Sequence, residues 1–267
     1  MKTSPNYRLR NFAADVRPTR PWLRIKASGW WTRVLLAGGA RLGAGLAKAD
    51  LAGAALADMN LNGANLSGAH LRETDLSNAR LSGANLYGAD LYGALLLEAD
   101  LSGAHLIGAY LRSARLIAAD LRRANLFRAD LSRAVLLRAD LSQAHLEYAN
   151  LHSAHLDNAL LCGARLNRAD LYGAKLVQAD LRDAALIGAV LTDADLSGAN
   201  LAGANLTNSN LATANLVDVM WSEQTRWPDG LADVMRERST PIGGGRWRVQ
   251  GAGNSGSDLE VPLVPVS

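Results

Sequence analysis

Leucine occupies every fifth position of the chain from Leu46 to Leu216, in 35 consecutive units without interruption. Two positions before each leucine lies alanine in 32 of these units, and the exceptions are Met59, Thr74 and Ser209. The residue directly before the leucine is Asp or Asn in 19 units. The chain therefore repeats the unit Ala-(Asp/Asn)-Leu-x-x, in which two positions are apolar and the other three vary.

A period of five residues suits neither an α-helix nor a flat strand. On a helix, five residues advance by about 500°, so successive leucines would spiral around the axis and form no apolar stripe. On a strand, an odd step places successive leucines on opposite faces. Every leucine points the same way only if the chain turns a corner once per unit. The pattern thus predicts a coiled solenoid with a leucine core.

The outward positions indicate how many units make one coil. Over 87–137 the residue after the leucine is mostly apolar in alternate units, and Asp before the leucine follows a period of ten at all but two positions, Asp75 and Asp195. Such alternation gives uniform columns only if a coil holds an even number of units. Two units are too few to enclose a core, so we expect four, which gives a square coil of 20 residues. The array then has about nine coils and a length of roughly 40 Å at strand spacing.

The unit Ala-(Asp/Asn)-Leu-x-x, as in Ala99-Asp100-Leu101-Ser102-Gly103, resembles the pentapeptide-repeat proteins. The resemblance covers 44–218, about two-thirds of the chain. It implies an all-β solenoid, a right-handed quadrilateral β-helix, in which Leu and Ala point inward and the other three positions face solvent.

Two non-repeat segments flank the array. Residues 1–43 form a basic arm, with nine Lys/Arg, one Asp and the tryptophans Trp22, Trp30 and Trp31, whereas 44–218 has a net charge of −4. The arm either caps the open end of the core or binds an anionic membrane surface or nucleic acid. We expect 219–242 to be a C-terminal cap with a short helix from Leu231 to Arg238, and 243–267 to be a flexible Gly/Ser/Pro tail.

Composition bears on the compartment. The single Cys162 excludes an intramolecular disulfide and is typical of a reducing compartment. The segment Val34–Ala40 is apolar over only seven residues, far short of the ~20 that a spanning helix needs. No secretory signal is evident at the start of the chain. We therefore expect a cytoplasmic protein, or one held peripherally at a membrane.

A square rod of leucine offers no obvious cleft for convergent catalytic groups, so we expect no enzyme activity, no cofactor and no metal site. His152 and His155 are only three residues apart, but a corner lies between them and should direct them to adjacent faces. Cys162 follows a core leucine and should face outward with no histidine in register.

The outer faces supply the candidate binding residues. Two apolar columns should lie exposed on opposite faces: Leu97, Ile117 and Leu137 with Leu95 and Val135 beside them, and Tyr87, Ile107 and Phe127. One acidic column contains Asp100, Asp120, Asp140 and Asp180. A basic belt should surround the middle coils, and its simplest interpretation is solvated charge that balances the stacked Asp: Arg112, Arg115, Arg122, Arg123, Arg128, Arg133 and Arg138.

Several functions remain open at this point. The first is a non-enzymatic scaffold that binds a protein partner through these faces, with a homodimer formed by an apolar face or by the C-terminal segment. The resemblance also implies binding of DNA gyrase by mimicry of DNA, although a ~40 Å duplex carries roughly 24 negative charges. The array has only 18 acidic residues and 14 basic ones. A third alternative is an adaptor for membranes or nucleic acid that acts through the basic arm.

Overall fold

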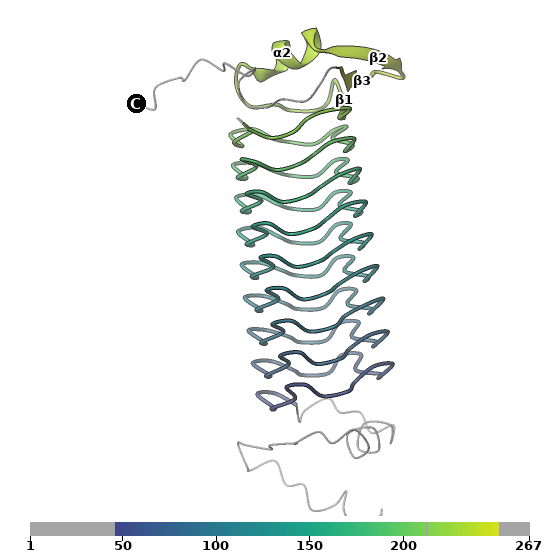
Figure 1. Ribbon diagram of the computed structural model, residues 1–267, viewed down its shortest axis with the longest axis vertical. Helices are drawn as coiled ribbons and strands as arrows, with labels where there is room; N and C mark the ends of the chain where they lie inside the picture. Colours follow the sequence, from purple (N-terminus) through teal and green to yellow (C-terminus); the bar gives the residue numbers. More distant parts are fainter. Residues whose placement is uncertain (1–45, 212, 251–267) are drawn as a thin grey trace, which may run out of the picture.

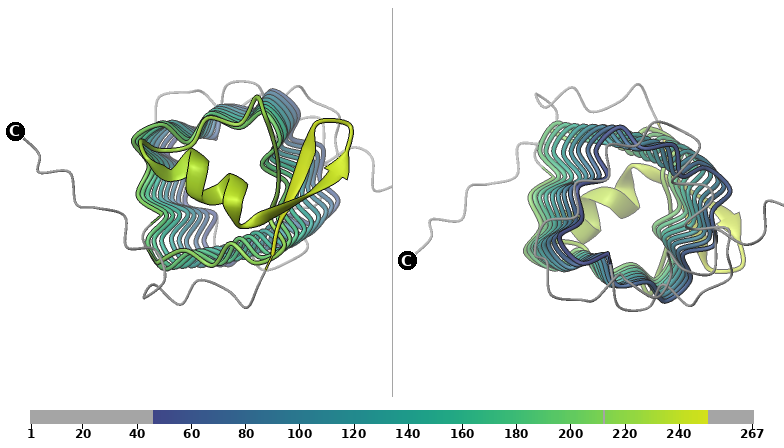
Figure 2. Two further views of the ribbon diagram at one scale, coloured as in Figure 1. Left: turned by 90° about the horizontal axis from the view of Figure 1, so that it is seen from above. Right: turned by 90° about the horizontal axis from the view of Figure 1, so that it is seen from below.

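The computed structural model describes residues 46–211 and 213–250. The chain forms a straight rod of stacked coils, with a small cap at its C-terminal end (Figure 1). Parallel bridges join the residue before the leucine to the residue 20 positions later, from Asp50 with His70 to Asn200 with Met220. Viewed along the axis, the coils have a four-sided outline and stack with only a small gradual rotation (Figure 2). The predicted coil of four units is therefore confirmed.

The interior is the leucine ladder itself. Every leucine of the five-residue ladder, from Leu46 to Leu216, is buried, with at most 6% of its surface exposed. Alanine packs beside it and is buried along the array, where its small side chain lets the backbone turn tightly. Where the ladder has Thr74 instead, the buried hydroxyl donates a hydrogen bond to the carbonyl of Leu51 at 2.8 Å, which offsets the cost of burying it.

Backbone hydrogen bonds explain the preference for Asp or Asn. In the unit around Leu101, the Leu101 N–H donates to the carbonyl of Asp120 in the next coil and the Gly103 N–H to that of Arg122, at 2.7 and 2.9 Å. The N–H after this leucine has no backbone acceptor. The Asp100 carboxylate accepts it from Ser102 at 3.0 Å. The Asp or Asn before the leucine thus satisfies the one donor that the coil leaves unpaired.

The second residue after each leucine forms a corner of the coil with positive φ, as at Gly103 (φ 62) and Arg123 (φ 58). Glycine suits this left-handed conformation, although many corners carry a longer side chain that stands away from the rod. The corners are therefore the positions where charge projects farthest into solvent.

A three-stranded sheet and one helix close the C-terminal end. Strands β1 (Met220–Ser222), β2 (Ser239–Gly243) and β3 (Arg246–Val249) form an antiparallel sheet in the order β1-β3-β2, and helix α2 spans Leu231–Glu237. The buried side chains of the cap cover the last coil, and they are Trp221, Trp227, Leu231, Met235 and Val249. The predicted short helix is confirmed and ends at Glu237, one residue earlier than expected.

The structure differs from the prediction of a flexible tail beginning at residue 243. Strand β2 ends at Gly243, and Gly244 and Gly245 form the hairpin turn to β3, with φ of 62 and 67°. Strand β3 is held by Val249, which is buried, and by Trp247, whose ring stacks on Trp221 at 5.8 Å. Arg and apolar residues alternate over 246–249, but four residues are too few for this pattern to predict the strand on its own. The arm 1–43 and residues 251–267 lie outside the described residues.

None of the helices in the described part of the chain is long and apolar enough to cross a membrane.

Candidate interaction surfaces

The square coil has four faces, which we name after the first leucine that lies under each. Face A lies over Leu51, face B over Leu56, face C over Leu61 and face D over Leu66, and each face recurs every 20 residues. Faces B and D are opposite each other, as are A and C. A residue's position in the repeat thus fixes both its face and its neighbours in the adjacent coils.

Face B carries the aliphatic column that the sequence predicts. Leu95, Arg115 and Val135 bridge one another in consecutive coils, and Leu97, Ile117 and Leu137 lie beside them in the next column. All five aliphatic side chains are half-buried, so the expectation of an exposed patch is wrong. Side chains one coil apart, at about 5 Å, cover each other's flanks and leave only their outer ends to solvent.

Face D carries the second column, and only Tyr87 in it is exposed, at 61%. Ile107 and Phe127 are half-buried. Phe127 packs edge-on against Tyr148 with the ring centroids 5.6 Å apart, and the guanidinium of Arg128 lies 5.1 Å from the Phe127 centroid. The apolar column therefore ends in an aromatic cluster covered by a cation.

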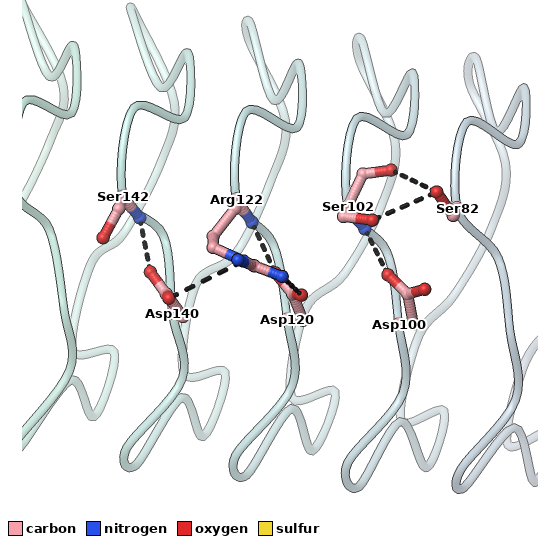
Figure 3. A network of polar contacts seen from close by, with 7 residues as sticks. All are labelled: Ser82, Asp100, Ser102, Asp120, Arg122, Asp140 and Ser142. Atoms are coloured by element: carbon pink, nitrogen blue, oxygen red, sulfur yellow. Dashed lines mark hydrogen bonds and ion pairs between the residues drawn. The ribbon is translucent and has the colours of Figure 1, made fainter.

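Arginines partly neutralise the acidic column on face C. Arg122 donates to Asp120 through Nε at 2.8 Å and lies 3.8 Å from Asp140 (Figure 3). Its hydrogen bond, more than its charge alone, lowers the pKa of the Asp120 carboxyl. Arg182 lowers the pKa of Asp180 in the same way. Asp100 and Asp140 each accept the backbone N–H two residues later, so these carboxylates belong to the coil's own hydrogen bonding.

The basic belt forms a ring around the rod. All seven arginines are exposed and together they occupy all four faces: Arg112, Arg115, Arg122, Arg123, Arg128, Arg133 and Arg138. Within the described chain, Arg122 is the one member with an ion pair. Arg123 donates to Gln143 at 2.9 Å, and Arg128 lies over aromatic rings. The interpretation that the belt balances the stacked Asp column holds for Arg122 alone.

Charge is distributed in bands along the rod. Residues 46–110 hold three Lys/Arg and seven Asp/Glu, a net charge of −4. Residues 111–140 hold seven Arg and three Asp, a net charge of +4. Residues 141–218 hold four Lys/Arg and eight Asp/Glu, again −4. A narrow cationic ring thus lies between two acidic segments.

Comparison with known proteins agrees with this architecture. The family model described as pentapeptide repeats matches in 8 copies, over residues 49–86, 84–123, 124–161, 144–183 and 179–218. The chain belongs to the pentapeptide-repeat family. Its array is accordingly a right-handed quadrilateral β-helix.

Among solved pentapeptide-repeat structures, the chain is similar to HetL from the cyanobacterium Nostoc sp. strain PCC 7120, which is involved in heterocyst differentiation regulation. The identity is 43% over 68% of this chain and 84% of HetL, with a TM-score of 0.51. It is also similar to Rfr23 from the cyanobacterium Cyanothece 51142, at 41% identity over 35% of this chain and 63% of Rfr23, with a TM-score of 0.35.

A more distant similarity is to QnrB1, a plasmid-mediated fluoroquinolone resistance protein, at 19% identity over 62% of this chain and 82% of QnrB1, with a TM-score of 0.47. A search of curated proteins found no match. Leu and Ala occupy two of every five positions, so any two pentapeptide-repeat arrays in register share much of their sequence through the core. Identity of this kind shows the fold and leaves the partner open.

Face A of the pentapeptide-repeat rod carries a polar aromatic surface that sequence reasoning misses. Tyr92 and Tyr110 are exposed at 40% and 56%, and Arg72 pairs with Asp90 at 2.6 Å while its guanidinium lies over the Tyr92 ring. These residues line an open hollow of about 340 Å³. Arranging the sequence in rows of 20 residues would reveal it, since Tyr92, Arg112, His152 and Tyr172 then share one column.

The histidines form no metal site in the described part of the chain, where no three His, Cys, Asp or Glu side chains gather as ligands. His152 instead stacks on Tyr172, with the centroids 5.1 Å apart, on face A. His155 lies on face B, because the corner between the two turns the chain. Cys162 is half-buried on face C.

Proposed function

We propose that this chain is a non-enzymatic interaction scaffold and that its contact surface is formed by the middle coils. One observation carries the proposal: the apolar columns of faces B and D lie in the same coils as the arginine belt. Leu97 to Leu137, Tyr87 to Phe127 and the belt overlap along the rod. Aromatic, aliphatic and arginine side chains in one patch are the composition of protein-binding surfaces.

The clustering of arginine favours a contact surface over a surface that only keeps the rod soluble. A rod needs exposed charge for solubility, but that need is met as well by Lys, Glu or Asp dispersed along the array. Here seven arginines gather beside half-buried aliphatic columns, and in the described chain six of them have no acidic partner. Arginine in such a setting pairs readily with acidic groups on another molecule.

Mimicry of DNA is the second candidate, and the charge distribution disfavours it. A duplex presents one negative charge per ~1.7 Å along its whole length. This rod alternates between −4, +4 and −4, and its acidic column is partly neutralised by Arg122 and Arg182. We expect gyrase supercoiling to proceed equally with and without the protein. Inhibition or drug protection that survives removal of residues 1–43 would favour the mimic instead.

An adaptor that acts through the basic arm is the third candidate. The arm's net charge of +8 should draw it to anionic lipid or nucleic acid with an affinity that falls steeply with salt. Co-sedimentation of the full chain and of a chain lacking 1–43, with anionic vesicles and with duplex DNA, tests this. A cytoplasmic or peripheral location remains a prediction.

The scaffold proposal is tested on face D. A partner recovered with the immobilised full chain is purified, and its affinity is measured for wild type and for Ile107→Ser combined with Phe127→Ser. Neither side chain is part of the leucine core, so the fold should persist, as thermal unfolding will check. We expect affinity to fall at least about tenfold, since both substitutions remove apolar surface that would be buried at the centre of the contact.

The matched control is Ile187→Ser, because Ile187 occupies the same column outside the belt and is 39% exposed. Its affinity should equal that of wild type. Equal losses in both variants, or none in either, would show that the middle coils are not the contact surface.

A further inference from the structure

Face B has a symmetry in its sequence that the other apolar face lacks. The coil that contains Ile117 lies at the centre of the aliphatic column, with the coils of Leu97 and Leu137 one step on either side. Suppose that two copies meet on face B and are related by a twofold axis. The axis lies in the plane between the two faces, perpendicular to the rods, at the level of Ile117. The copies then run antiparallel, and each residue faces the residue of its own column at the same distance beyond the axis.

The apolar positions pair with apolar positions under this operation. Leu97 faces Leu137 of the second copy, Leu95 faces Val135, and Ile117 faces itself. Ala118, an exposed corner residue, also faces itself and allows the two faces to approach closely. Each half-buried aliphatic side chain thus meets a partner that removes its remaining exposed surface from water.

The charged positions are complementary in the same register. Glu98 and Arg138 are exposed corner residues, with φ of 54 and 57°, and they occupy the same column two coils apart. Under the twofold axis, Glu98 of each copy faces Arg138 of the other, which gives two equivalent ion pairs. Farther out, Asp75 faces His155 and Ser77 faces Asp157. Arg115 is the exception, because it lies between Leu95 and Val135 in its column and faces itself across the axis. In the dimer its exposed side chain must turn away from its counterpart toward solvent.

In other registers the apolar and charged residues of the two copies no longer match. If the axis moves half a coil toward the N-terminus, Leu95 faces Arg115 and Ser77 faces Leu137. If the rods run parallel instead, Glu98 lies opposite Leu95 and no acidic residue meets Arg138. Face D offers no equivalent, since Arg128 there would face Gly88.

We propose that the chain forms an antiparallel homodimer through face B, centred on Ile117 and fixed in register by the pairing of Glu98 with Arg138. This rests on the proposed use of the outer faces for protein contacts and names the occupant of one of them. The aliphatic part spans three coils, roughly 10 Å between the outermost ones, so the contact is smaller than the ~800 Å² per partner of a standard interface. A weak, micromolar dimer is expected.

The test uses the full chain and two charge reversals, Glu98→Arg and Arg138→Glu. Each variant alone brings like charges together twice per dimer and should weaken self-association at least about tenfold in sedimentation velocity at low salt. In an equimolar mixture, the introduced arginine of one variant faces the introduced glutamate of the other, and the native Arg138 faces the native Glu98. The mixture should therefore associate as wild type does. The combined variant Glu98→Arg with Arg138→Glu should also recover.

Matched controls lie on face A, where Glu73 and Arg133 occupy the same corner position, with φ of 54 and 58°. Glu73→Arg and Arg133→Glu change the net charge identically and should leave self-association unchanged. A wild type that is monomeric at high micromolar concentration, or a mixture that fails to recover, overturns the dimer. In either case a loss of partner binding in the face D variant would still support the scaffold function.

Discussion

The repeat array and the C-terminal cap are held together in different ways. In the array, each leucine contacts the same kinds of neighbours in the coils above and below, and the bridges repeat every 20 residues. In the cap, Trp221 joins Trp227, Trp247 and Ser239, residues from separate segments of the chain. The array is stabilised by many equivalent contacts, the cap by a few irreplaceable ones. A single substitution should therefore differ between the two regions in how much stability it removes and in how far along the rod the loss extends.

The largest expected effect is in the middle of the array. Leu121→Asp would bury an unpaired carboxylate at a position that is fully buried and surrounded by leucine, and we expect it to cost more than about 4 kcal/mol of unfolding free energy. Asn158→Asp, at an exposed corner, should change it by less than about 0.5 kcal/mol. Chemical denaturation of both variants measures this. Similar losses in the two would contradict the assignment of inward and outward positions.

The second largest effect is expected in the C-terminal cap. Trp221 is buried, and its indole N–H donates to the Ser239 hydroxyl at 2.9 Å. Trp221→Ala should cost about 3–5 kcal/mol, but within the cap, because coils far from it keep all of their own contacts. Hydrogen exchange should then become fast at 231–249 while amides near Leu121 stay protected. Uniform loss of protection along the rod would show that cap and array unfold as one unit.

This contrast also explains what sequence alone can predict. The inward positions, the coil of 20 residues and the columns follow from a local pattern repeated 35 times, so each unit supports the same inference. Strand β3 escapes prediction because its partners, β1 and β2, lie outside its own short segment and its pattern is only four residues long. A short alternating segment beside three glycines gives no local sign that it packs on Trp221.

The sequence predicts where the candidate surfaces lie, but not how exposed or how charged they are. The columns and the belt lie where the repeat puts them. Their exposure differs from the expectation because stacked neighbours one coil apart shield each other, which a position-by-position count ignores. The role of Asp is likewise hidden in the sequence, since its carboxylate is needed by the N–H two residues later, as between Asp100 and Ser102. The charge of a column is thus only partly available to a partner.

The smallest effect concerns such a carboxylate. Arg122 lowers the pKa of Asp120 from its ordinary 3.8, so the ionised form is stabilised in the folded protein. The corresponding contribution to stability is present above about pH 4 and is lost as the pH falls through the lower, folded-state pKa. Arg122→Gln should raise the Asp120 pKa and flatten this part of the pH dependence, followed by the carboxyl resonance in NMR. Arg122 is exposed and solvent screens the pair, so the unfolding free energy at pH 7 should fall by less than about 1 kcal/mol. In the cap, Glu223→Gln removes a more exposed partner of Arg236 and should change stability no more. An unchanged Asp120 titration in the Arg122 variant would mean that the backbone N–H, and not the guanidinium, sets the acidity of this column.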